Sequence, residues 1–168
     1  MDDRWTAGTR VVANQIDRAR WRTTLTYRFH PAFTAGMEYN PLARKASPLA
    51  NWLVAQEGHR RPAIILGTSS DRIGTPSGQS FYATASKDLS HTTGLPVAPY
   101  IGAAYGTYEN RLRAIGGLDV RFTGRWNALL IFDGVHLHST LDYRRGRHVV
   151  SLLLVRGNDP GVSYSVSF

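Results

Sequence analysis

The chain has 168 residues, of which 42% are hydrophobic and 19% charged, and its formal net charge is +8. This hydrophobic content excludes a disordered chain, and the absence of cysteine excludes disulfide scaffolds and thiolate chemistry. No apolar stretch approaches the ~18 residues that a membrane helix needs, which excludes a helical membrane protein but not a barrel of strands. The length predicts a single domain, residues 1–168.

The first half of the chain alternates between apolar and polar residues. A strand is predicted at 4–14, and the clearest one follows at 21–29, where Arg22 and Arg28 lie on the polar face. His30 and Pro31 interrupt the pattern, which resumes at 33–39 with Glu38 on the polar face. Two such strands joined by a very short turn predict a hairpin.

Residues 40–58 are open to two interpretations. A short helix would place Leu49, Trp52 and Leu53 on one face, but Pro41 and Pro48 would confine it to about two turns. A loop followed by a strand at 50–56 is favoured. Less regular alternation predicts further strands at 62–69, 79–87 and 96–108.

The alternation becomes clear again in the second half, in residues 112–122 and 135–144, and strands are also predicted at 126–133, 148–156 and 161–168. Short turns rich in Gly, Pro, Asn and Asp separate these segments and leave no room for crossover helices. The predicted fold is all-β, an antiparallel up-and-down β-barrel of about twelve strands with short turns on both sides.

Such a barrel has either its apolar face inside, as in a soluble lipocalin-like protein, or its apolar face in lipid. The polar faces favour lipid, because they are rich in Arg and the chain has only two lysines, Lys45 and Lys87. Aromatic residues also gather at strand ends, as in the girdles of membrane barrels. The rim nearer the termini is predicted to hold Trp5, Phe29, Phe122, Trp126 and Tyr143, and the opposite rim Trp21, Tyr39 and Trp52.

The last eight residues, "GVSYSVSF", carry a resemblance. Val162, Tyr164, Val166 and Phe168 form one apolar face, and this ending resembles the C-terminal signature of bacterial outer-membrane β-barrels. The resemblance implies a transmembrane barrel in the outer membrane of a Gram-negative bacterium, with membrane lipid and the barrel assembly machinery as partners. It also implies pairing of the last strand with the first, and a mature sequence, since "MDDRWTAG" contains no apolar signal core.

Charged residues on the polar faces form the candidate pore lining. They are Arg22, Arg28, Glu38, Arg113, Asp119, Arg121, His136, His138, Asp142 and Arg144. A lumen rich in Arg favours a narrow, porin-like passive channel for small anionic solutes. The alternative is that these side chains fill the lumen of a structural barrel, and strand number alone does not decide between the two.

Other chemistry is less well supported by the sequence. His136 and His138 share a face but lack a third ligand, so neither a metal nor a cofactor is predicted. A lipid hydrolase would need a serine close to one of these histidines, and Ser139 is predicted on the opposite face, so no catalytic residue is assigned. A soluble ligand-binding barrel is a further alternative. The basic residues form no single run, so no nucleic-acid partner is expected.

Overall fold

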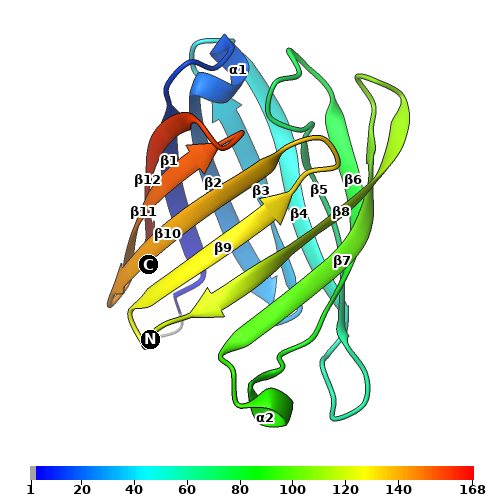
Figure 1. The fold of residues 1–168 in the computed structure, drawn as a ribbon. Coiled ribbons are helices and arrows are strands. Elements are labelled where there is room, and N and C mark those ends of the chain that lie inside the picture. Colours follow the sequence, from blue (N-terminus) through cyan, green and yellow to red (C-terminus); the bar gives the residue numbers. More distant parts are fainter. Residues whose placement is uncertain (1–2) are drawn as a thin grey trace.

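The computed structural model describes residues 3–168 as a closed barrel of twelve antiparallel strands (Figure 1). Each strand pairs with its neighbours in the chain, and β1 pairs with β12. The strands are β1 Trp5–Val12, β2 Trp21–His30, β3 Phe33–Asn40, β4 Lys45–Ala55, β5 Ala63–Ser70, β6 Gln79–Ser86, β7 Val97–Gly106, β8 Arg111–Arg121, β9 Trp126–Phe132, β10 Leu137–Arg145, β11 His148–Val155 and β12 Asp159–Ser167. The predicted all-β, up-and-down barrel is confirmed.

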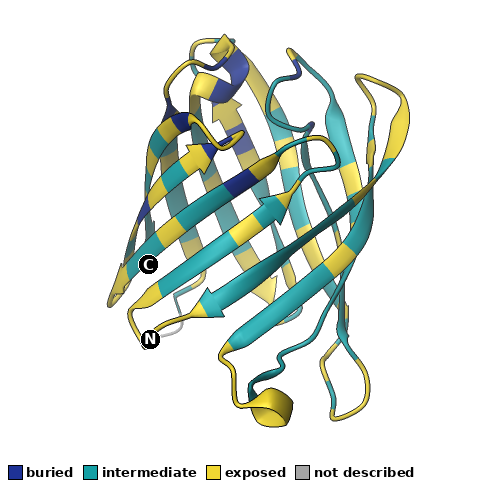
Figure 2. Ribbon diagram, in the orientation of Figure 1, coloured by how far each residue is buried: buried dark blue, intermediate teal, exposed yellow. Residues whose placement is uncertain are grey.

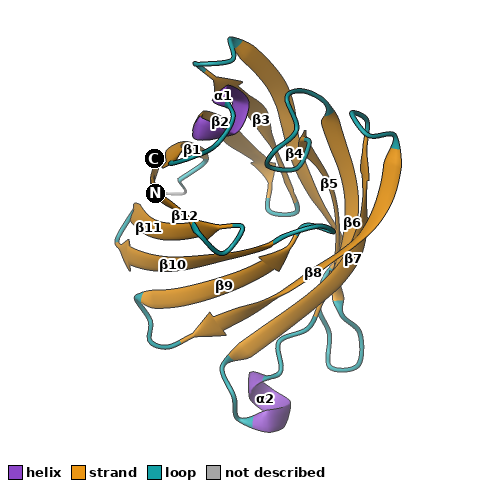
Figure 3. Ribbon diagram, turned by 45° about the horizontal axis from the view of Figure 1, so that its top comes forward, coloured by secondary structure: helices purple, strands orange, loops and turns teal. Residues whose placement is uncertain are grey.

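Two short helices interrupt the strand order. α1, Asp17–Arg20, connects β1 to β2, and α2, Ser90–Thr93, lies between β6 and β7 at the other end of the barrel (Figures 1 and 3). Among residues 3–168, neither helix is long and apolar enough to cross a membrane, an observation that concerns helices only. Neither helix is predictable from the sequence, because segments this short have no helical periodicity.

The first and last strands close the barrel. Trp5 and Phe168 exchange two backbone hydrogen bonds, of 2.8 and 2.9 Å, and the pairing continues from Thr6 opposite Ser167 to Val12 opposite Gly161. Closure removes the unpaired edges that an open meander would present to other chains. Both termini therefore lie at one end of the barrel, opposite α1 (Figure 1).

β4 differs from the prediction in its start. It begins at Lys45 rather than at residue 50 and includes Pro48, which lies opposite Met37 of β3. β4 pairs with β5 only from Ala50 onward, so the missing N–H of Pro48 falls where the strand has no second partner. The helical interpretation of residues 40–58 is wrong.

Because β4 starts earlier than predicted, Trp52 lies at a different position in the barrel from the predicted one. This residue lies opposite Phe33, the first residue of β3, and is therefore at the end of the barrel that holds the termini. Its predicted place at the opposite rim is wrong, because that prediction counted from a strand beginning at residue 50.

Candidate functional site

The wall of the barrel has an apolar outer face and a polar inner face. Along β3, Met37 and Tyr39 are 51% and 46% exposed, whereas Glu38 between them is fully buried. The same outward exposure recurs around the barrel, in Leu25, Leu66, Phe81, Ile101, Leu112, Leu130, Leu141, Leu152 and Val162 among others. A soluble monomer rarely exposes a contiguous apolar patch larger than a few hundred Å². Here the apolar surface encircles the molecule.

Aromatic side chains lie near both ends of this surface. At the end with the termini, Trp5 packs on Tyr27 and Trp126 on Tyr143, with ring centroids 4.8 and 4.9 Å apart. Phe29 and Phe122 lie at the same end, as the sequence analysis expected, and Trp21 and Tyr39 lie at the opposite one. On the last strand, Val162, Tyr164 and Phe168 are exposed and Val166 is half-buried.

The end opposite the termini is packed with polar side chains, and we call it the packed end. Arg18 of α1 is buried and donates hydrogen bonds to the carbonyl oxygens of Asp71, Arg72 and Thr75, and to the Thr75 hydroxyl. Burial lowers the pKa of Arg18 below its ordinary value. These bonds fasten α1 to the loop formed by residues 71–78. Figure 2 shows the buried residues concentrated at this end.

Below α1, three arginines face a single buried glutamate. Arg22 Nε and Nη2 donate to Glu38 Oε2 at 2.9 and 2.7 Å. Arg10 lies opposite Arg22 in the β1–β2 register, and both line a cavity of about 220 Å³ together with Arg18. Arg10 Nε is buried and has no hydrogen-bond partner among residues 3–168. Positive charge therefore exceeds negative charge around Glu38.

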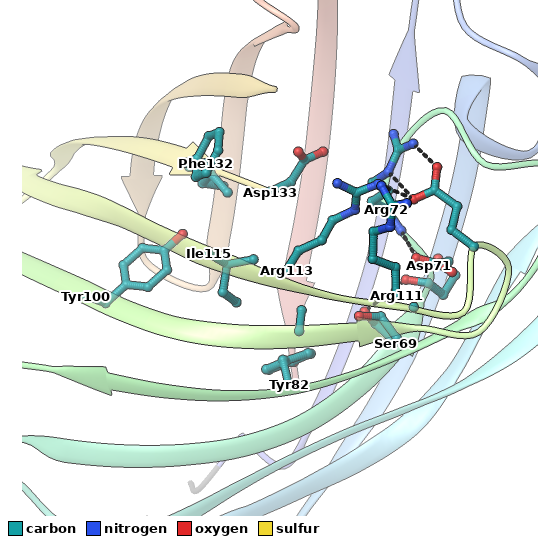
Figure 4. A pocket seen from close by; sticks show the side chains of 16 residues that line it. Ser69, Asp71, Arg72, Tyr82, Tyr100, Arg111, Arg113, Ile115, Phe132 and Asp133 are labelled. Carbon is teal, nitrogen blue, oxygen red and sulfur yellow. Dashed lines mark hydrogen bonds and ion pairs between the residues drawn. The ribbon is translucent and has the colours of Figure 1, made fainter. Parts of the chain in front are cut away.

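A second cluster at the packed end joins two connections. Arg72 Nη2 and Arg113 Nη2 bind the two carboxylate oxygens of Glu109, at 2.5 and 2.8 Å. Figure 4 shows Arg72 and Arg113 close together in a cavity of about 170 Å³, with the ion pairs as dashed lines. The hydrogen bonds from Arg72 and then Arg113 lower the pKa of Glu109 to about 2. The carboxylate therefore stays ionised near neutral pH.

The two candidate histidines differ in position. His136 lies in the connection before β10, so it is not on the strand where it was predicted. His138 is buried: its Nδ1 accepts the N–H of Arg156 at 3.2 Å, and its Nε2 bonds to Asp133 Oδ2 at 2.9 Å. Burial opposes ionisation of Asp133, but hydrogen bonds from His138 and two backbone N–H groups hold its pKa below the ordinary value.

This pairing bears on the hydrolase alternative. Both ring nitrogens of His138 are occupied, and no serine hydroxyl bonds to either histidine within residues 3–168. A Ser/His pair for acyl transfer is therefore not formed there. No group of three or more His, Asp or Glu side chains in the described chain is arranged to hold a metal.

The end that holds the termini is hollow. One cavity, of about 530 Å³, is lined by Arg4, Arg28, Arg144, Arg147 and Asp3, and we call it the vestibule. A neighbouring cavity of about 480 Å³ is lined by Glu57, Asp88, Asp119 and Arg121, and a third of about 320 Å³ includes Asp119, Asp142 and Arg144. Apart from His136 and the buried Glu38, the predicted pore-lining residues all border a cavity.

Several residues that line the lumen were not predicted from the sequence. Arg10 was detectable, because it occupies the polar face of β1 opposite Arg22. Arg18, Arg72 and Arg147 lie in connections, where no alternation shows which way a side chain points. Their roles depend on where each connection folds, and that is set by tertiary contacts.

No protein-family model matches this chain, and no curated protein matches its sequence. The arrangement of the lumen and the outer surface is therefore the basis for a functional proposal.

Proposed function

We propose that this protein is an integral β-barrel of a bacterial outer membrane and acts as a narrow passive pore for small anionic solutes. The observation that carries the proposal is the continuous apolar exterior around a polar lumen. A lipocalin-like soluble barrel would need the reverse arrangement, with side chains such as Leu152 and Val162 inside rather than 58% and 54% exposed.

Strand length and aromatic positions support the membrane assignment. The strands contain 7 to 11 residues, close to the ~9–11 that a tilted membrane strand requires. Trp and Tyr side chains lie toward both ends, where an interface with lipid headgroups would place them. The alternating final strand, paired with β1, fits recognition by the barrel assembly machinery and contact with lipid.

The balance of charge in the lumen supports a preference for anions. Arg10, Arg18 and Arg22 surround Glu38 at the packed end, and four arginines line the vestibule beside one aspartate. Rings of Arg in a pore attract anions and repel cations. The lumen thus presents excess positive charge around Glu38 at the packed end and in the vestibule at the other end.

A second candidate function is a structural or anchoring barrel without conduction. The packed end favours it, because α1 and residues 71–78 are held across the barrel by the buried Arg18. The two functions differ in whether this end lets ions pass.

Conductance across a planar lipid bilayer separates them. The refolded protein is added to a bilayer with a KCl gradient, and the reversal potential is measured. The pore proposal predicts small, discrete current steps with a reversal potential on the anion-selective side. Insertion without current steps would favour the structural barrel, and cation selectivity would contradict the proposed solute class.

A further inference from the structure

The vestibule combines the size of a small-molecule site with unbalanced charge. Its volume of about 530 Å³ lies within the range of roughly 300–1,000 Å³ typical of ligand pockets. Among the charged lining residues that lie within 3–168 there are four guanidinium groups and a single carboxylate, that of Asp3. Four elements contribute these groups: the segment before β1, the end of β2, the end of β10 and the β10–β11 turn.

Contacts with Asp3 involve Arg147 and Arg28 but not Arg144. Asp3 Oδ1 pairs with Arg147 at 2.9 Å, and the Asp3 carbonyl accepts a hydrogen bond from Arg28 at 2.7 Å. The guanidinium of Arg144 makes no hydrogen bond or ion pair with any residue from 3 to 168. The remaining polar lining consists of hydroxyl groups, which can donate to an anion, from Thr6, Thr26, Thr34, Ser165 and Ser167.

The opposite wall at the same end has the other sign. Glu57, Asp88 and Asp119 line the cavity of about 480 Å³, where Arg121 binds Asp88 at 2.7 Å. Glu57 also forms an ion pair of 3.1 Å with Lys87, which does not itself line this cavity. An anion entering this end would therefore be attracted to the β1–β2 side and repelled from the side of β6 to β8.

From this geometry we infer that the vestibule binds a small oxyanion with two or more negative charges, of the phosphate or dicarboxylate class. The planar guanidinium offers paired N–H donors that match the oxygens of either group. The inference rests on the proposed function only for the route by which the anion reaches the vestibule. Binding itself requires a folded barrel but no ion conduction.

The test is calorimetric titration of the protein, refolded in a zwitterionic detergent at low ionic strength, with inorganic pyrophosphate and separately with succinate. The vestibule variant is Arg28→Gln with Arg144→Gln. Its control, Arg60→Gln with Arg61→Gln, removes the same charge from the exposed connection between β4 and β5 at the same end. Arg144→Gln alone guards against misfolding, because that side chain has no hydrogen bond or ion pair to lose within the described part of the chain.

We expect at least one of the two probes to bind the native protein. Affinity should fall about tenfold or more in the double vestibule variant, less in Arg144→Gln alone, and hardly at all in the control. An equal loss of affinity in the vestibule variant and the control would contradict the vestibule site, because affinity would then depend only on the net charge of the protein. So would the failure of both probes to bind the folded native protein.

These outcomes separate the site from the channel. Absent binding together with an anion-selective current would overturn the vestibule site and leave the pore proposal standing. Vestibule-dependent binding without any current would support the site and contradict passive conduction.

Discussion

The two ends of this barrel solve the problem of a charged lumen in different ways. At the packed end, guanidinium groups are paired with carbonyl oxygens and carboxylates, as with Arg18 and the pair of Arg22 with the buried Glu38. In the vestibule, Arg144 lines a cavity of about 530 Å³ and its guanidinium has no hydrogen-bond or ion-pair partner among residues 3–168. Buried charges are tolerated when they are paired, so the packed end should carry stability and the vestibule should carry recognition.

The largest effect is expected at Glu38. Glu38→Gln would leave the half-buried Arg22 and Arg10 without the buried carboxylate they face, at a cost of about 3–5 kcal/mol in the free energy of unfolding. Urea unfolding in lipid vesicles, followed by tryptophan fluorescence, measures this. Asp17→Asn, which alters an exposed carboxylate of α1, should leave the urea midpoint unchanged. Equal midpoints for the two variants would show that the packed end does not stabilise the barrel.

Arg18→Met should cost about 2–4 kcal/mol, because three carbonyl oxygens and one hydroxyl would lose a buried donor. The same variant should increase single-channel conductance, since α1 would no longer be fastened to residues 71–78. Arg20→Met in the same helix, where the side chain is about half-exposed, should cost less than about 1 kcal/mol. An unchanged conductance in Arg18→Met would argue that α1 does not restrict the lumen.

Acid should weaken the packed end through Glu109. Its pKa of about 2 in the folded protein lies below the ordinary 4.5, so its contribution is complete above the ordinary value and is lost as pH falls toward 2. The urea concentration at the unfolding midpoint should therefore be lower at about pH 3 than at about pH 6. This decrease should be smaller in Glu109→Gln. The ion pairs of Glu109 with Arg72 and Arg113 would be of no consequence for stability if the native protein and Glu109→Gln lost stability in parallel.

The smallest effect on stability is expected in the vestibule. Arg144→Gln should change the free energy of unfolding by no more than about 0.5 kcal/mol, because its side chain forms no hydrogen bond or ion pair with residues 3–168. Its reversal potential in a KCl gradient should nevertheless move toward zero, since a positive charge leaves the mouth of the lumen. A large loss of stability without a change in selectivity would reverse the roles assigned to the two ends.

The barrel itself was predictable because alternation with a period of two is a local property. The pattern around Leu25 and Met37 fixed which residues face out, and the two lie opposite each other in the structure. The terminal pattern from Val162 to Phe168 likewise pointed to pairing with β1, which the register confirms. The local pattern did not predict the start of β4. Pro48 is compatible with a strand only where that strand lacks one neighbouring strand, and β4 pairs with β5 only from Ala50 onward.

The interior was less predictable, because its key groups come from connections. Arg18 became important only when α1 folded against residues 71–78, and His138 paired with Asp133 rather than facing an open lumen with His136. The contact of Arg18 with Asp71 joins residues 53 positions apart, and the pair of His138 with Asp133 depends on a side chain in a connection, so neither leaves a periodic trace. The aromatic-girdle and pore-lining roles stay predictions, to be tested in lipid.

The most direct test of the account is the mobility of the protein on a gel after refolding into lipid vesicles. A barrel held in lipid by its apolar exterior should resist SDS until boiled, so unboiled and boiled samples should migrate differently. We expect this shift for protein refolded with vesicles and no shift for protein diluted into plain buffer. A chain that folds as a soluble monomer in plain buffer, with no shift in vesicles, would contradict the outward placement of Leu152 and Val162 in lipid.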